Sequence, residues 1–513
     1  MVEIETKSLL ASLNKPESLM GVLLLAGALL LFRFTLFDQD LSHIPLLDAH
    51  LPRAERWKAF VQNQKGVLEK GYKNFRCVFR MDTPEGPMVV VPPHMMDEMK
   101  NINEENMDNI SALSDMTESK LTGITSTTPM MNHLVKGDLT ASLSTAHHDA
   151  RLKFSLTPPD RINPRLAKTA EEAVATEIPN CPEWTKVPFF QCLLNIVAIV
   201  SGDIFLGPEM CRNEEYMKLS VGYTLDAFAG IHKLKQWRKW MRPIGRYFVP
   251  ELKVANAYRS RSNKFLGPLI KQRRAMIEQG ADLPDDLLSW TMRKTSKFPE
   301  EIKSDDDIAF MQLRLSLAAI HTTSNTGGIL MRDIVTQPGL VQALRAEIEE
   351  VLARHNGVFS TKALYEMRLL DSAMKESQRM HMLGPMMYHN KTRRGITLSD
   401  GTYIPPNTTI TGASLASAMD PSKWPNPETY DPYRFLKMRQ ASDEDAGKHQ
   451  FVTLNKDMVT FGYGKHACPG RFFAANEIKI IFINILRRFD IETREGEVDF
   501  MGQPELFLRN MRA

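Results

Sequence analysis

Cysteine is scarce in this sequence, with five residues among 513, and none of them forms a CxxC pair or the ligand spacing of a zinc finger. The pattern argues against a finger-type metal site and fits a reducing compartment. Four cysteines are interpreted as small buried hydrophobic residues: Cys77, Cys181, Cys192 and Cys211. The fifth, Cys468, differs from the others because it stands in a glycine-rich loop.

Strong charge imbalance and repetition are also missing. The formal net charge is only +3, and no concentrated basic stripe of the kind used to bind nucleic acid is present. We find no internal repeat and no low-complexity tract. With 43% hydrophobic and 24% charged residues, the composition excludes wholesale disorder and a multi-span membrane protein.

One long apolar run stands near the N-terminus. Residues from Leu19 to Phe32 are all apolar or glycine, and the run continues to Phe37 past Arg33 and Thr35. This is close to the roughly 20 residues that span a bilayer. The alternatives are a cleaved signal peptide, for which a small-residue cleavage site is lacking, and a buried core helix. We expect a transmembrane anchor at about 19–37 within an N-terminal segment 1–40.

The remaining residues 41–513 are expected to form one mainly helical domain with a minor β-sheet. The region 53–70 is predicted to form a polar helix. Residues 75–81 and 88–91 are predicted to form two strands of a hairpin, joined by a turn that contains proline and glycine. From about 164 to 336 the pattern is nearly all helical. The last third mixes helices with strand-like pieces such as 395–410.

Cys468 stands in a glycine-rich loop just before a strongly apolar helical stretch that runs to about residue 488. The positive end of a helix lowers the pKa of a thiol placed there, which favours a thiolate. Pro469 suits the first helical position, so backbone donors to the sulfur must come from Gly470 and the residues after it. The alternative is an ordinary buried cysteine before a helix.

The string from Phe461 to Gly470 resembles the cysteine-loop signature of the cytochrome P450 family, F-x-x-G-x-R-x-C-x-G. Phe461, Gly464, Cys468 and Gly470 occupy the signature positions, and His466 stands where the family usually has Arg. The resemblance implies that Cys468 is the axial thiolate ligand of a haem iron (iron protoporphyrin IX). It also implies that His466 contacts a haem propionate, with a charge that depends on pH near neutrality.

The family also has a Glu-x-x-Arg helix and a P-x-R-F segment. Glu376 and Arg379 lie three residues apart on one predicted helix face, and Arg434 lies in Pro432-Tyr433-Arg434-Phe435. The resemblance implies that the carboxylate of Glu376 lies between the two guanidinium groups as a structural support for the cysteine loop. A solvated surface pair is the alternative.

A long helix is expected to begin at Ser304, which precedes three aspartates and can cap the helix. With no proline before Pro338, the helix spans about 32 residues. Within it, Ala318 to Thr323 resembles the family's distal motif A-G-x-D/E-T-T, with Thr322 at the oxygen-activating position. His321 replaces the usual acid, as in fungal secondary-metabolite oxidases, and either relays protons or is an ordinary helix residue satisfied by a backbone carbonyl.

Two further features of the family concern the propionate contacts and the substrate contacts. Its Trp-x-x-x-Arg propionate contact has no true match; His147 and Arg151 reproduce only the spacing, and Lys136 is a weaker substitute. Substrate contacts in the family lie near the distal helix and, here, in residues 384–388.

The segment 232–246 interleaves basic residues with Trp237 and Trp240, which suits either a membrane surface or a solvated helix with packed aromatics.

The resemblance implies a monooxygenase that inserts one oxygen atom from O2 into a C–H bond of a lipophilic molecule such as a terpenoid. No flavin or dinucleotide fingerprint is present, so electrons must come from an NADPH-cytochrome P450 reductase, with cytochrome b5 as a second candidate partner. Lys465 and Arg471 either face that partner or are merely solvated. The expected location is the endoplasmic reticulum membrane, with the catalytic domain in the cytosol.

Two other functions stay open. A haem-thiolate isomerase or dehydratase would rearrange an oxidised substrate without consuming O2, but such members typically lack the distal threonine, so Thr322 argues against this class. A haem sensor or carrier without turnover is the other alternative, and the expected proton-relay site, Thr322 with His321, argues against it.

Overall fold

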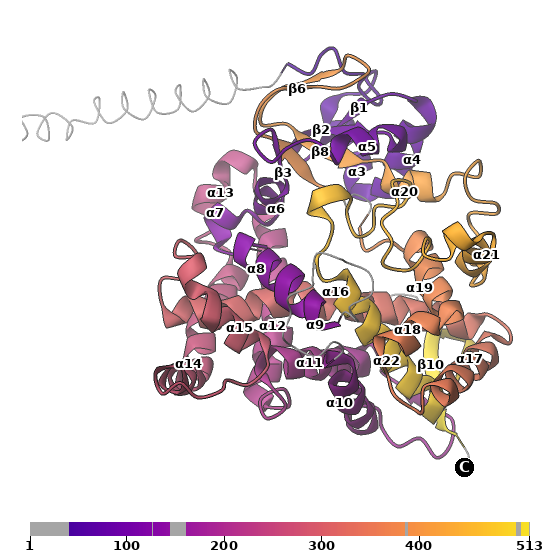
Figure 1. Cartoon of the computed structure of the whole chain (residues 1–513). Helices are drawn as coiled ribbons and strands as arrows, with labels where there is room; N and C mark the ends of the chain where they lie inside the picture. Colours follow the sequence, from indigo (N-terminus) through magenta and orange to yellow (C-terminus); the bar gives the residue numbers. More distant parts are fainter. Residues whose placement is uncertain (1–39, 126, 144–160, 385–387, 499–503, 512–513) are drawn as a thin grey trace, which may run out of the picture.

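The computed structural model describes residues 40–511 except 126, 144–160, 385–387 and 499–503. The expected anchor at 19–37 lies outside the described residues. The described chain is mainly helical, with the helices around one large hydrophobic core, which confirms the expected class. Figure 1 shows the helices filling most of the molecule, while the largest sheet gathers at one end with the N-terminal helices.

The longer helices build the body of the domain. They are α10 (Ile162–Glu177), α11 (Phe189–Leu206), α12 (Glu214–Lys235), α14 (Pro250–Glu278), α16 (Asp305–Thr336), α17 (Leu340–Arg354), α19 (Arg368–Met380) and α22 (Arg471–Arg488). The shorter helices are α3 (Arg53–Gln62), α4 (Gln64–Asn74), α5 (Met96–Met99), α6 (Asn109–Thr117), α7 (Ser119–Thr122), α8 (Pro129–Leu134), α9 (Thr140–Leu143), α13 (Arg242–Gly245), α15 (Leu287–Lys294), α18 (Thr361–Glu366), α20 (Ser414–Ala418) and α21 (Arg434–Gln440).

Three small sheets complete the described part of the fold. The largest has the order β1-β2-β8-β5-β3, with β2 and β8 parallel and the other neighbours antiparallel. Its strands are β1 (Phe79–Thr83), β2 (Gly86–Val91), β3 (Met107–Asp108), β5 (Asn390–Thr392) and β8 (Thr409–Gly412). The other two sheets contain β4 (Thr185–Val187), β9 (Phe489–Val498) and β10 (Pro504–Asn510), and β6 (Ile396–Thr397) with β7 (Tyr403–Ile404).

Helix α16 crosses the centre of the molecule (Figure 1) and has the predicted start and length of 32 residues. Its capping box is formed because the side chain of Ser304 accepts from the backbone N–H of Asp307, and the side chain of Asp307 accepts from the backbone N–H of Ser304 at 3.0 Å. Close packing holds α16 in place: a Cβ on Gly327 would meet Leu193 of α11 at 3.0 Å and Phe482 of α22 at 3.4 Å. The absence of a side chain at 327 therefore brings the three helices together.

The N-terminal helical region differs from the prediction of one helix over 53–70. Helix α3 ends at Gln62, and α4 begins at Gln64. The side chain of Asn63 accepts a hydrogen bond from the backbone N–H of Gly66, so it caps the second helix and breaks the first. Among the described residues, only α11 is long and apolar enough to cross a membrane, and it is largely buried as a core helix.

Candidate functional site

The loop that carries Cys468 is closed by its own backbone. The N–H of Cys468 donates to the carbonyl of Phe461 at 2.7 Å, and the N–H of Gly462 donates to Val459 at 2.9 Å. Gly464 has a φ of 69°, in the left-handed region, and a Cβ there would lie 2.5 Å from Cβ of Lys100. A side chain at position 464 would therefore be both strained and blocked, which explains the glycine.

The sulfur of Cys468 lies before the start of α22. The helix begins at Arg471, so Pro469 precedes it by two residues and does not occupy the predicted first helical position. Burial raises the pKa of the Cys468 thiol, while a hydrogen bond from the N–H of Gly470 and the charge of Arg471 act to lower it. The predicted role of Gly470 as a donor therefore agrees with this geometry, although the helix starts later.

The segment from Pro129 to Leu143 lies against this loop. It contains α8, a π-helical turn over Val135–Leu139, and α9. The amine of Lys136 donates to the carbonyl of Lys465 at 3.3 Å, and the hydroxyl of Thr140 donates to Pro469 at 3.4 Å. Lys136 thus lies at the cysteine loop, whereas His147 and Arg151 lie outside the described residues. Single π-helical turns of this kind occur often at functional sites.

His466 and Arg471 carry donors that have no protein partner. Nε2 of His466 and Nε of Arg471 are both buried and unpaired. Burial lowers the pKa of His466, and the charges of Glu104 and Asp108 partly oppose this effect. Arg471 is not freely solvated, because its Nη1 donates to the carbonyl of Cys468 at 2.8 Å. Lys465, by contrast, is exposed.

A charged network on the other side of the loop was not predicted from the sequence. The hydroxyl of Tyr463 donates to Asp97 at 2.8 Å, and the amines of Lys100 and Lys456 donate to the same carboxylate at 2.7 and 3.0 Å. These hydrogen bonds hold the pKa of Asp97 well below its usual range, the bond from Lys100 contributing most. The only sequence signal was the spacing of Asp97 and Lys100, which does not point to the loop.

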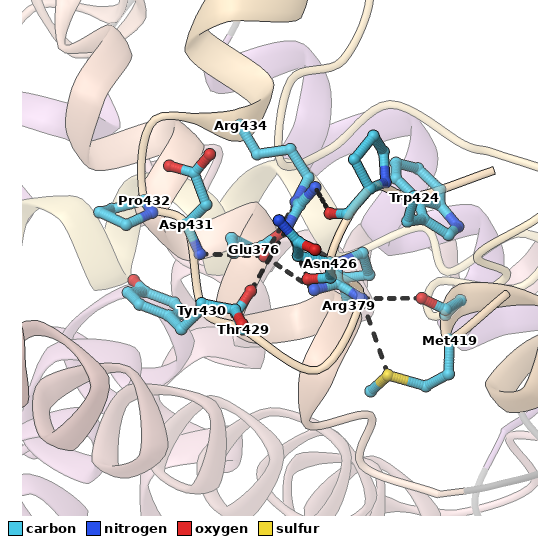
Figure 2. A network of polar contacts seen from close by, with 12 residues as sticks. Glu376, Arg379, Met419, Trp424, Asn426, Thr429, Tyr430, Asp431, Pro432 and Arg434 are labelled. Carbon is cyan, nitrogen blue, oxygen red and sulfur yellow. Dashed lines mark hydrogen bonds and ion pairs between the residues drawn. The ribbon is translucent and has the colours of Figure 1, made fainter. Parts of the chain in front are cut away.

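Glu376, Arg379 and Arg434 meet in one buried cluster (Figure 2). The carboxylate of Glu376 accepts two bonds from Arg379, at 2.8 and 2.9 Å, and the Nε of Arg434 lies 3.0 and 3.1 Å from its two oxygens. The side chains of Glu376 and Arg379 are 0% exposed, so this is not the solvated surface pair of the alternative interpretation. Bidentate geometry of this kind satisfies a buried carboxylate well.

This Glu376 cluster is connected to the cysteine loop through α20. Nη1 of Arg379 donates to the carbonyl of Ala418, the last residue of α20, at 2.8 Å. At the other end of α20, the hydroxyl of Ser414 accepts the N–H of Val459 at 2.9 Å. Because Val459 is two residues before Phe461, the cluster fixes the chain that enters the loop.

On α16, small and polar residues form an exposed stripe within an otherwise buried helix. Ala318, Thr322 and Asn325 are exposed, although their neighbours Ile320, Thr323 and Ser324 are buried. Residues three and four apart share a helix face, so these three lie along one line. The hydroxyl of Thr322 donates to the carbonyl of Ala318 at 2.8 Å, which leaves its oxygen lone pairs directed at the open face.

The side chain of His321, next to Thr322 in the sequence, contacts helix α12. Its Nε2 lies 3.2 Å from the carbonyl of Val221 on α12, which is the contact expected of a helix residue satisfied by a backbone carbonyl. Because a carbonyl only accepts, Nε2 carries the proton and Nδ1 is left as the acceptor. Burial lowers the pKa of His321, so the ring is neutral near pH 7.

The described residues fit a haem group. A Cβ at position 470 would lie 4.0 Å from the sulfur of Cys468, so the glycine there leaves the sulfur without a covering side chain from that residue. The stripe of Ala318 and Thr322 offers a second open face without bulky side chains. The unpaired donors of His466 and Arg471 are suited to the acidic substituents of the ring. No cluster of three or more His, Cys, Asp or Glu that could hold a metal ion without the ring occurs among the described residues.

Comparison with known proteins gives a family match. The family model described as cytochrome P450 matches residues 155–512 of this chain. Cytochrome P450 monooxygenase braC of Annulohypoxylon truncatum is 33% identical over 468 residues, covering 91% of this chain and 89% of the relative. Cytochrome P450 monooxygenase pyr3 of Aspergillus fumigatus is 32% identical, with 86% of this chain and 81% of the relative covered. Cytochrome P450 monooxygenase adrA of Penicillium rubens is 29% identical, with 94% and 92% covered.

Proposed function

This chain belongs to the cytochrome P450 family of haem-thiolate monooxygenases, and we propose that Cys468 is its iron ligand and that it hydroxylates a lipophilic molecule of the terpenoid type. The observation that carries the ligand assignment is the Cys468 loop, with its sulfur next to Gly470 and the start of α22. A haem held through a thiolate activates O2 and supplies the oxidising chemistry. The side chains around it hold the ring and handle protons.

On the side of the sulfur, the protein holds the thiolate and the acidic edge of the ring. The N–H of Gly470 and the charge of Arg471 stabilise the anionic sulfur, which opposes the cost of its burial. The unpaired Nε2 of His466 and the amine of Lys136, which already reaches the loop, would hold the propionates. His466 is a weaker and more pH-dependent partner than arginine.

On the opposite side of the ring, Thr322 takes part in proton transfer. Its hydroxyl already donates to Ala318, so the free lone pairs accept a hydrogen bond from water on the exposed face of α16, which positions that water for proton transfer. His321 holds α16 against α12 through Val221, and only its Nδ1 remains to orient water. We therefore assign the proton transfer chiefly to Thr322, with His321 in a supporting position.

The substrate class rests on the distal helix and on the relatives. His321 before Thr322 resembles the motif of fungal secondary-metabolite oxidases, and the relatives reported above are fungal monooxygenases. The open stripe of α16 begins at Ala318, whose small apolar side chain leaves space for a lipophilic molecule. The predicted substrate segment 384–388 is described only at Gly384 and Tyr388, and the latter is buried.

We further propose that the protein is held at the endoplasmic reticulum membrane by the segment 19–37 and by a second contact. Trp240, Ile244, Tyr247 and Phe248 are each more than half exposed. Exposed basic residues lie in the same stretch: Lys233, Arg238 and Lys239. This combination of aromatic and basic residues suits an anionic lipid surface.

The exposed stretch is fixed by a buried arginine. Arg242 is 2% exposed and binds the carboxylate of Glu85 with both Nη atoms, at 2.6 and 3.0 Å, and it also pairs with Glu118. Glu85 lies in the turn between β1 and β2, so the membrane contact is tied to the N-terminal sheet. This attachment places the proposed lipid-contacting residues beside the N-terminal sheet, which is the part of the domain that follows the predicted anchor in the sequence.

Electrons are proposed to come from an NADPH-cytochrome P450 reductase, with cytochrome b5 as a second donor. The exposed Lys465, next to Lys136 at the cysteine loop, offers positive charge to an acidic partner. Arg471 contributes less to that surface because it is bonded to the carbonyl of Cys468.

The experiment that tests the proposed function is product analysis with membranes that contain this chain and a reductase, fed candidate lipophilic skeletons. We expect hydroxylated products that require NADPH and O2. The Thr322→Ala variant should still consume NADPH but release peroxide and form little product, because the hydroxyl that positions the proton-delivering water is lost. Product formed without NADPH and O2 would instead indicate an isomerase or dehydratase, and binding without turnover a sensor.

A further inference from the structure

A second group of charged side chains is buried next to α19. Asp371 and Lys375 come from α19, Arg439 from α21 and Lys479 from α22, and they are 4%, 1%, 2% and 4% exposed. Lysine and arginine are almost never fully buried unless they are paired. This Asp371 cluster is separate from the Glu376 cluster and plays no part in the proton transfer proposed above.

The carboxylate of Asp371 is the centre of the cluster. Lys479 lies 2.6 Å from one of its oxygens, and Nη1 of Arg439 lies 3.3 Å from the other. Lys479 also donates to the carbonyl of Leu364 at 3.0 Å, which ties α22 to α18. Lys479 and Arg439 therefore pair with one carboxylate in the interior, while Lys375 needs other acceptors, because an unpaired buried charge is costly.

The remaining hydrogen-bond partners all belong to one stretch of chain, residues 446–453. The N–H of Phe451 donates to Asp371 at 2.9 Å. Lys375 donates to the carbonyls of Gln450 and Thr453, at 2.6 and 3.0 Å, and the Nε of Arg439 donates to Ala446 at 3.3 Å. Four hydrogen bonds to or from buried charged groups thus fix a stretch that has no helix or strand of its own.

The fixed stretch is in direct contact with the cysteine loop. The ring of Phe451 is 1% exposed and meets the ring of Phe461 edge to face, with centroids 5.2 Å apart. The carbonyl of Phe461 in turn accepts the N–H of Cys468 at 2.7 Å. One short path therefore leads from Asp371 through Phe451 and Phe461 to the backbone of Cys468.

We propose that Asp371, Lys375, Arg439 and Lys479 form a second positioning lock for the Cys468 loop, acting through Phe451 on Phe461. The inference rests on the proposed ligand role of Cys468. The Glu376 cluster holds the chain at Val459 from the side of α20, and the Asp371 cluster holds Phe461 from the side of residues 446–453. The sulfur is thereby held by two independent attachments.

The loss of this lock should loosen the loop without removing the ligand. When residues 446–453 are free, Phe461 and the N–H of Cys468 lose their support, and the sulfur is held less firmly in the position from which it would bind iron. The expected signature is faster hydrogen exchange in the loop together with partial loss of the thiolate-type band.

Two variants test the lock in the full-length haem protein. Lys375→Met removes the charge at similar volume and leaves Gln450 and Thr453 without their donor. Phe451→Leu keeps every charge and removes only the aromatic contact, so it is informative even if Lys375→Met folds poorly. The matched control is Asp286→Asn, which weakens another buried pair, with Arg273, in α14 and α15, far along the chain from this path.

The measurements are hydrogen exchange of peptides covering 459–470 and the spectrum of the reduced carbon monoxide complex. We expect both lock variants to speed exchange in that peptide by about tenfold and to lose part of the thiolate-type band. The control should speed exchange around 273–289 only.

Unchanged exchange and an unchanged spectrum in both lock variants would overturn the lock. Failure of the ligand assignment would look different. In that case the Cys468→Ala protein would keep the thiolate band, whatever the lock variants do.

Discussion

The two buried charge clusters on α19 are built differently. In the Glu376 cluster one carboxylate faces two planar guanidinium groups, and each guanidinium also donates to loop carbonyls. In the Asp371 cluster one carboxylate faces Lys479 and Arg439, while Lys375 is satisfied by carbonyls alone. Guanidinium groups form bidentate pairs with carboxylates, whereas an ammonium is a point charge that carbonyls can share.

This difference sets how strongly each cluster depends on its acid. Both guanidinium groups of the Glu376 cluster share the whole carboxylate, so its loss leaves two buried charges poorly paired. In the Asp371 cluster only Lys479 lies close to the acid, at 2.6 Å, while Arg439 is 3.3 Å away, so fewer short bonds are lost when the acid is neutralised. The Glu376 cluster should therefore contribute more to stability, and the Asp371 cluster should act mainly on the position of the loop.

The largest expected effect is that of Glu376→Gln. Removing the charge leaves Arg379 and Arg434 buried without their counter-ion, which costs about 3–5 kcal/mol of the free energy of unfolding. Denaturant unfolding of the purified haem protein measures this, together with the haem content. A loss below about 1 kcal/mol, the range of a surface pair, would show that the cluster does not support the fold.

Asp371→Asn should cost less, about 2 kcal/mol. The amide oxygen can still accept from Phe451, and only one short ion pair, that with Lys479 at 2.6 Å, is lost. The comparison of the two variants under the same denaturant conditions is the test. If Asp371→Asn were the more damaging substitution, the proposed order of the two clusters would be wrong.

The smallest expected effect is a pH dependence that belongs to Lys375 alone. Burial lowers its pKa from an ordinary 10.5 to about 8, the charge of Arg439 acts in the same direction, and that of Asp371 opposes. Between these pH values the unfolded chain binds a proton that the folded chain has released. The contribution of Lys375 to stability is therefore smallest below about pH 8, rises with pH through that window and is complete above 10.5.

The matched variant for this test is Lys375→Met. The difference in unfolding free energy, wild type minus variant, should shift in favour of the wild type by about 1 kcal/mol between pH 8 and 9. Burial lowers the pKa of the neighbouring His449, so that ring stays neutral between pH 8 and 9 in both proteins. Parallel pH curves for the two proteins would contradict the assignment.

The sequence predicted the parts of the site that depend on local chemistry. The cap at Ser304 and the length of α16 follow from aspartates and the absence of proline, and both are confirmed. The meeting of Glu376 with Arg434 was suggested by two short motifs. The glycine at 464 was predicted to permit a tight loop, although the neighbour that makes it necessary, Lys100, was not.

The parts that were missed depend on contacts between distant residues. Asp97 and Tyr463 are 366 positions apart, and the residues next to either of them in the sequence do not indicate that the two side chains form a hydrogen bond. Asp371 and Lys375 have the spacing of an ordinary solvated helix pair, so only their burial distinguishes them. Asn63 broke a predicted helix because its side chain caps the next one, a competition that periodicity alone does not resolve.

The central claim is that the sulfur of Cys468 is the iron ligand, and the carbon monoxide spectrum of the reduced protein tests it most directly. The wild type should give the thiolate-type band. Cys468→Ala should lose that band completely, whereas Cys211→Ala, which removes another buried cysteine, should keep it. A thiolate-type band in Cys468→Ala would contradict the account, because the ligand would then be another residue.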